Sequence, residues 1–367
     1  MTRGRDAALD NLKGLLIISV VYVHLYDMLG QKTPLLFTIR TIVLAVQMPL
    51  FLFLCGYFGK HAEKRRDAAW AEYLLPFLLF NTLYYLVRAE QEPGMQYVLL
   101  RPLNMYWFLL TLLIIRVLMP ELLRIRWLLP ISLIVALLAG GDPSIGRDLS
   151  LSRTICFLPF YLLGYFCTPA HMRRIRKLSL PVAWVGAAAG AFLALWMTDV
   201  LPVRKGSSHP FQLVNSYARQ GLTPWAGMEF RLAMYIAAPL LGIFLLRIVY
   251  ARRGLLTSIG KGSMTVYMLH AFPMLWMVGH WGFVCKIINW FVPAFAHIKY
   301  PGKLVGGVPQ LIVLVLYSFV VSWLLSAPPV VRTYDAFIQQ MKLWLFRAAK
   351  KQEKTKETEE TETVQGN

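Results

Sequence analysis

The sequence predicts an all-helical membrane protein, a bundle of about ten transmembrane helices with both ends of the chain in the cytoplasm. Three observations lead to this prediction. Hydrophobic residues make up 57% of the 367 residues and charged residues only 16%, whereas a soluble domain carries about a quarter charged residues. The apolar residues fall in blocks long enough to cross a bilayer, and the connections between them alternate between more and less basic.

The apolar blocks give the expected helices in chain order. The first block is not expected to be a cleaved signal peptide, because it contains His24 and Asp27 and no small-residue cleavage pattern follows it. The blocks at 127–141 and 154–168 are short for a bilayer span. The expected spans are 12–30, 35–58, 71–87, 105–120, 127–141, 154–168, 180–198, 228–246, 262–284 and 309–327.

The connections between the blocks predict the orientation. Lysine and arginine are denser in 59–70, 121–126, 169–178 and 247–261, which the positive-inside rule assigns to the cytoplasm. Much of the net charge of +19 is therefore expected to set topology and contact anionic lipid. Nucleic-acid binding is not expected, because the charge is dispersed over short loops. The long outer connections, about 199–227 and 285–308, are expected to bear part of an acceptor site.

The membrane region is expected to form one domain over residues 1–330. Residues 331–367 form a basic and then acidic cytoplasmic tail, whose polar end at 347–367 cannot bury a core and is expected to be disordered. The four cysteines lie in or beside apolar blocks without metal-ligand spacing, so they are interpreted as small hydrophobic residues.

The first expected helix carries two ionisable side chains on one face. Lys13 and His24 are eleven residues apart. At about 100° per residue they differ by only about 20° around a helix, and by about 16 Å along it. Ionisable groups at membrane depth are costly, so they are a functional-site hypothesis by default. Asp10 precedes Lys13 by three residues and Asp27 follows His24 by three, so each carboxylate can contact its neighbour.

Other polar side chains also interrupt the expected spans. They can satisfy one another within the bundle or extend to the interface, so a structural role is the ordinary alternative for each of them. The further candidates for a functional site are Arg40, Trp107, Arg116, Arg231 and His270, besides Asp10.

Lys13 and His24 together suit acyl transfer to a hydroxyl group. Histidine titrates near neutrality and can take a proton from a hydroxyl nucleophile. A cation one leaflet away could hold a phosphate of a donor that enters from the cytoplasm. Acetyl-CoA has that shape, with a phosphorylated head and a long arm ending in a thioester. The sequence has no glycine-rich phosphate loop, metal cluster or serine-elbow motif, so no metal cofactor is expected.

Five segments in order resemble those of a known family. They are the run from Arg5-Asp6 through Lys13-Gly14 to His24, Pro49-Leu50 to Tyr57-Phe58, Tyr106 to Leu109, Phe157 to Tyr165, and Ile259 to His270. In these segments the chain resembles the acyltransferase-3 family of integral membrane O-acyltransferases, particularly its branch of fucose 4-O-acetylase-like proteins.

The resemblance implies a ten-helix fold and transfer of an acyl group, usually acetyl, from coenzyme A to a hydroxyl of an exported glycan. Its opening motif, a basic residue, ten others and a histidine, maps onto Lys13 and His24 and implies that His24 is catalytic. Asp27 is taken as the catalytic partner of His24. Many members carry two arginines three apart after the second helix, a pattern that 60–66 lacks. The residues expected to help Lys13 hold the donor there are Lys64, Arg65 and Arg66.

The expected function is therefore that of a multi-pass plasma-membrane O-acetyltransferase acting on a cell-envelope saccharide. A secondary transporter or flippase that uses Lys13, His24, Asp27 and Arg40 is an alternative. Against it, the first span contains no proline and no half-repeat is visible. A membrane sensor or scaffold without chemistry is the third reading.

Overall fold

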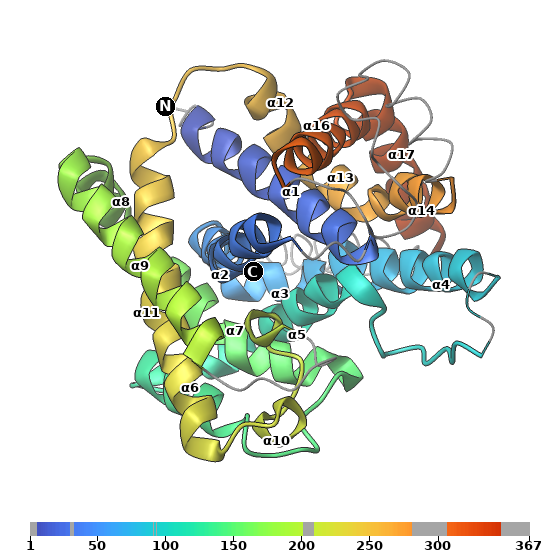
Figure 1. Cartoon of the computed structure of the whole chain (residues 1–367). Coiled ribbons are helices and arrows are strands. Elements are labelled where there is room, and N and C mark those ends of the chain that lie inside the picture. The colour runs from blue at the N-terminus through green and yellow to red at the C-terminus, as the bar shows by residue number, and fades with distance from the viewer. Residues whose placement is uncertain are drawn as a thin grey trace, which may run out of the picture.

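The computed structural model describes residues 6–29, 33–90, 92, 94–200, 209–280 and 307–345, and within these ranges all regular secondary structure is helical (Figure 1). The longer helices are α1 (Ala7–Leu29), α2 (Pro34–Tyr57), α4 (Leu75–Ala89), α5 (Trp107–Leu122), α7 (Leu151–Phe166), α9 (Leu180–Val200), α11 (Pro224–Ile248), α16 (Gly307–Leu325) and α17 (Pro328–Leu345). The shorter ones are α3 (Ala62–Ala69), α6 (Leu128–Leu138), α8 (Pro169–Arg176), α10 (Tyr217–Gln220), α12 (Leu255–Lys261), α13 (Ser263–Leu269) and α14 (Ala271–Gly279).

The membrane class follows from the length and composition of these helices. Among the described residues, six helical stretches are individually long and apolar enough to cross a bilayer. They comprise α1, α2, α9 and α11, together with α5 and α7, each extended at its start by a short 3-10 turn. Helices α16 and α17 form a bent pair, at 59°, that would make a seventh span. The all-helical membrane fold is thus confirmed, whereas ten spans and cytoplasmic termini stay predictions.

Three expected spans differ from uniform long helices, and proline explains two of the differences. Expected span 71–87 belongs to one helical path, α3 to α4, with a π-helical turn at Trp70–Leu74. That turn lies just before Pro76, which cannot donate a backbone hydrogen bond. Expected span 262–284 divides at His270, because Pro273 cannot bond the carbonyl of Leu269. The helix α6 has only 11 residues.

Threonine followed by proline begins three of the helices. The hydroxyls of Thr33, Thr168 and Thr223 accept hydrogen bonds from backbone N–H groups in the first turns of α2, α8 and α11, at 3.4, 3.2 and 3.3 Å. The proline that follows each one has a φ already suited to a helix and lacks an N–H that would be unpaired there. These caps fix where the chain turns back into the bundle.

Helix α1 lies inside the bundle, between α2 on one side and α12 and α16 on the other (Figure 1). Gly14 and Gly260 face each other where α1 crosses α12, and the opposing backbone leaves no room for a Cβ atom at either position. Helices α2 and α7 pack in the same way through Gly56 and Gly164. Close backbone approach through small residues is typical of helix packing in membranes.

The outer helices present apolar side chains away from the protein. Along α9, which packs on α11 (Figure 1), Val182, Trp184, Val185 and Phe192 are all exposed. A bilayer would cover such a surface, which is far too apolar for water. The expected tail 331–367 begins within α17, so its first part is helical. The predicted disorder at 347–367 lies outside the described residues.

Candidate active site

The two predicted residues of α1 lie at opposite ends of one helix. The Lys13 ammonium pairs with Asp10 Oδ1 at 2.7 Å, the contact expected from their spacing, and lies 5.7 Å from the ring centre of Phe58. Near the other end of α1, His24 lines a cavity of about 260 Å³. The eleven-residue spacing along an unbroken helix separates the two side chains by about 16 Å along its axis.

The cavity at His24 lies at the end of the bundle where α1 ends and α5, α7 and α11 begin. Besides α1 and α2, it is lined by the first residues of α5 and α7 and by the segment that precedes α11. Its polar lining comprises Gln47, Asn104, Arg147, Ser150, Arg153 and Gln212. A polar chamber next to a histidine, between membrane-length helices, is the default candidate for a binding or catalytic site.

A second imidazole, that of His270, lies beside His24. The ring centroids are 5.5 Å apart. His270 is fully buried, and its Nδ1 donates to the carbonyl of Tyr267 at 2.8 Å, which leaves Nε2 as the atom with the free lone pair. Nε2 has no hydrogen-bond partner in the described structure. The structure therefore brings together His24 and His270, which lie far apart in the sequence.

Arg153 is a member of the cavity that the sequence did not single out. Its guanidinium lies 4.5 Å from the ring centre of Trp107, and its Nε donates to the carbonyl of Gln212 at 3.0 Å. Arg153 is within electrostatic reach of His24. The only sequence signal is its place at the start of an apolar block, which is also the usual place for an interfacial arginine.

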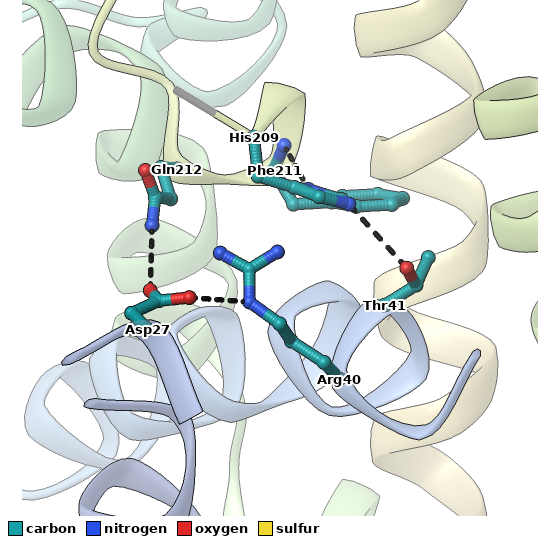
Figure 2. Close-up of polar contacts among 6 residues, drawn as sticks. All are labelled: Asp27, Arg40, Thr41, His209, Phe211 and Gln212. Carbon is teal, nitrogen blue, oxygen red and sulfur yellow. Dashed lines mark hydrogen bonds and ion pairs between the residues drawn. The ribbon is translucent and has the colours of Figure 1, made fainter. Parts of the chain in front are cut away.

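Asp27 belongs to a polar cluster that joins α1, α2 and the segment before α11 (Figure 2). Its Oδ1 accepts from Arg40 Nε at 2.7 Å, and its Oδ2 accepts from the Gln212 amide at 3.4 Å. Both carboxylate oxygens thus have partners other than His24. The catalytic role of Asp27 remains a prediction, and the geometry gives it a direct part in holding Arg40 and Gln212.

His209, another residue that the sequence did not single out, completes this cluster. Figure 2 shows the guanidinium of Arg40 between Asp27 and the stacked rings of His209 and Phe211. The Phe211 N–H donates to His209 Nδ1 at 3.4 Å, so Nε2 carries the proton and donates to Thr41 Oγ1 at 3.3 Å. Burial, and then the charge of Arg40, lower the pKa of His209 to about 3, so the ring is neutral near pH 7.

The Lys13 end of the bundle holds a second group of cations. Arg116, near the end of α5, is 5% exposed and lies 5.7 Å from the ring centre of Tyr73. Its Nε and Nη1 have no hydrogen-bond partner in the described structure. Arg116 and Lys13 are both within electrostatic reach of Cys55 on α2. This end therefore carries a buried guanidinium with unused donors.

The predicted donor residues of the 60–66 connection differ from one another. Lys64 and Arg65 are exposed on α3, and Arg66 is half-buried with a long 3.7 Å contact to Asp67. Lys60, in contrast, donates to the backbone carbonyls of Gly164, Tyr165 and Cys167 and closes the end of α7. The exposed side chains of α3 remain candidates for holding a phosphate, whereas Lys60 is used within the fold.

Of the two remaining candidates, Trp107 lines the cavity and Arg231 does not. Arg231 is buried on α11, where its Nη1 donates to the carbonyl of Ala136 at 2.5 Å and its guanidinium covers the ring of Tyr217. These contacts join α11 to α6 and lie away from the cavity lining. Trp107 lines the cavity, and its ring contacts both Phe157 and Arg153 of α7.

Unusual backbone conformations gather around the cavity. In the described residues, the non-glycine positions with positive φ are Asn104 (44°), Leu149 (53°), Ser150 (54°) and Leu213 (52°). Asn104 and Ser150 line the cavity, and Leu149 and Leu213 are sequence neighbours of lining residues. Left-handed backbone at such residues is costly and tends to concentrate at functional sites.

The acyltransferase-3 family model, described as an acyltransferase domain, matches residues 6–327. No curated protein and no solved structure matches the chain.

Proposed function

Because the chain belongs to the acyltransferase-3 family over residues 6–327, it is a membrane acyltransferase, and we propose that it transfers an acetyl group from acetyl-CoA to a hydroxyl of a cell-envelope saccharide. The placement of His24 in a polar cavity at one end of α1, with Lys13 at the other, carries the proposal. The fucose 4-O-acetylase-like branch and the plasma membrane are part of the same proposal.

His24 acts as the general base. In the proposed step, a ring nitrogen of His24 takes the proton of the acceptor hydroxyl as the oxygen forms a bond to the thioester carbonyl carbon. The tetrahedral intermediate then collapses, the carbon–sulfur bond breaks, and the histidine returns its proton to the departing sulfur. A positioned general base is typically worth about 10²–10⁴-fold in rate. His270 packs against the His24 ring and helps to hold it in place.

The cations at the other end of α1 bind the phosphorylated head of the donor. Lys13 and the buried Arg116 supply the inner part of this site, and Lys64, Arg65 and Arg66 supply its exposed edge. Charge-assisted hydrogen bonds to phosphate suit guanidinium and ammonium groups. The separation of about 16 Å between Lys13 and His24 lets the long donor arm extend along α1 to the reacting thioester.

The acceptor reaches His24 from the opposite side of the membrane. Positive-inside orientation puts the Lys13 end in the cytoplasm, where coenzyme A is made, and the cavity at the outer face. The acceptor site then includes the segment before α11, which contributes Phe211, Gln212 and Val214 to the cavity lining. On this proposal the acyl group crosses the membrane while the donor head stays inside.

Release of coenzyme A by the purified protein tests the proposed function. The protein in lipid nanodiscs is incubated with acetyl-CoA, with and without envelope glycans, and the free thiol is titrated. We expect glycan-dependent release that falls at least 100-fold in His24→Gln. His280→Gln is the matched control, because His280 is exposed and lies outside the cavity lining. Equal release by folded His24→Gln protein, or no release with any glycan, would refute the proposal.

A further inference from the structure

The cavity at His24 is cationic. Arg147 and Arg153 both line it, whereas its lining within the described chain contains no aspartate or glutamate. The neighbouring carboxylate, Asp27, is already paired with Arg40 and accepts from Gln212. A neutral sugar needs no such charge, because its hydroxyl groups are satisfied by neutral donors and acceptors of the kind that Gln47 and Asn104 supply.

The guanidinium of Arg153 is held in a fixed orientation. It stacks on Trp107 at 4.5 Å and uses Nε for the Gln212 carbonyl at 3.0 Å. In the part of the chain that the structure describes, no carboxylate pairs with Arg153. The remaining two nitrogens form the planar end of the group, which is the geometry that binds a carboxylate with two parallel hydrogen bonds.

The surrounding helices add to the positive potential. Helices α5 and α7 both begin at the cavity, and Ser150, immediately before α7, lines it. The starts of helices carry partial positive charge and favour anions. Arg153, which pairs with no described carboxylate, and two helix starts therefore give the space next to His24 a positive potential, and Arg147 lines the same space.

We propose that the natural acceptor is an anionic saccharide, whose carboxylate is bound by Arg153 with help from Arg147 while a neighbouring hydroxyl faces His24. This inference rests on the proposed function, because it names the substrate class of the same site. The competing source of negative charge is the phosphorylated head of the donor. Lys13, at the distant end of α1, argues against that source, since the donor head cannot lie at both ends of the helix.

Ligand binding tests the proposal without any turnover. Methyl glucuronide and methyl glucoside share a sugar ring and differ in the carboxylate, so their dissociation constants are compared on the purified full chain by calorimetry in nanodiscs. We expect the glucuronide to bind at least about tenfold more tightly, because its carboxylate would form charge-assisted hydrogen bonds with Arg153 that the glucoside cannot form. We expect Arg153→Gln to abolish the preference and Arg153→Lys to retain part of it.

The controls separate the alternatives. Arg219→Gln removes an exposed arginine of α10 that does not line the cavity, and the preference should survive there. Equal binding of the two glycosides by the wild-type protein would overturn the proposal. So would tight, Arg153-dependent binding of adenosine 3′,5′-bisphosphate, because the cavity would then hold the donor head. Glucuronide preference without acetyl-CoA turnover would instead contradict the proposed function and leave the anion site standing.

Discussion

Replacing Arg116 with methionine should raise the stability of the protein and, at the same time, lower its affinity for coenzyme A. Arg116 is 5% exposed, and its Nε and Nη1 have no partner within the described structure. Each buried hydrogen-bond donor without an acceptor lowers the free energy of unfolding by about 1–3 kcal/mol. The contact with the Tyr73 ring at 5.7 Å offsets about 0.5–2 kcal/mol of this cost. A flexible apolar side chain such as methionine removes the unmet donors without opening a large cavity.

For the two unmet hydrogen-bond donors together, less the ring contact, the net expectation for Arg116→Met is a gain of about 3 kcal/mol in the free energy of unfolding. With an unfolding entropy of about 2.1 cal/mol/K per residue, that gain raises the unfolding midpoint by about 1–5 °C in the absence of ligand. The assay is thermal unfolding in detergent, followed by intrinsic fluorescence, with and without coenzyme A. The stabilisation by coenzyme A should fall in the variant, because Arg116 is proposed to contact a phosphate of the donor head.

Arg231→Met is the matched comparison for this prediction. Arg231 is also buried, but its guanidinium donates to the Ala136 carbonyl and covers the Tyr217 ring. Its replacement leaves that carbonyl without this donor and should lower the midpoint. A lower midpoint for Arg116→Met, together with a full response to coenzyme A, would show that Arg116 is structural and would refute the reasoning.

Two further predictions concern groups outside the proposed chemistry. His209 has a pKa of about 3 in the folded protein and about 6.5 when unfolded, so between these values the unfolded chain binds more protons. Stability should therefore fall as the pH drops below about 6.5, and His209→Gln should flatten that part of the midpoint-against-pH curve; an unchanged slope would exclude His209 as its source. Lys60→Met should lower the midpoint, because three carbonyls at the end of α7 lose a shared cationic donor, while the affinity for coenzyme A stays as in the wild type. A clear loss of affinity would instead show that Lys60 contributes to coenzyme A binding.

The sequence predicts the membrane class and α1 well, because both depend on local patterns. An apolar block indicates contact with lipid wherever it lies in the chain. A spacing of eleven residues puts two side chains on the same helix face, whatever the other helices do. The ion pair between Asp10 and Lys13 follows in the same way from a spacing of three. Block length alone does not reveal the π-helical turn before Pro76 or the break at His270.

The rest of the candidate site depends on contacts between distant segments. Asp27 is three residues from His24, yet both of its oxygens pair elsewhere, because Arg40 and Gln212 approach from α2 and from the segment before α11. Arg153 and His209 carry no local signal of function, since an arginine at the start of an apolar block and a histidine in a connection are ordinary. Arg153 reaches the cavity because α7 packs against α2 and α5, and His209 reaches the cluster around Arg40 because its segment packs against α2.

The glycine contact between α1 and α12 fixes the position of α1 and therefore the positions of Lys13 and His24 along it. Gly14 and Gly260 let the two backbones touch, so the first half of α1 cannot slide or turn against its neighbour without a steric clash. Lys13 lies beside this contact, and the helix continues unbroken to His24. The distance between the two ends of the proposed site is thus set by the count of residues rather than by a hinge. The fixed length would select acyl donors by the length of their arm. If the arm is too short, the thioester does not reach His24, even when the phosphorylated head binds tightly.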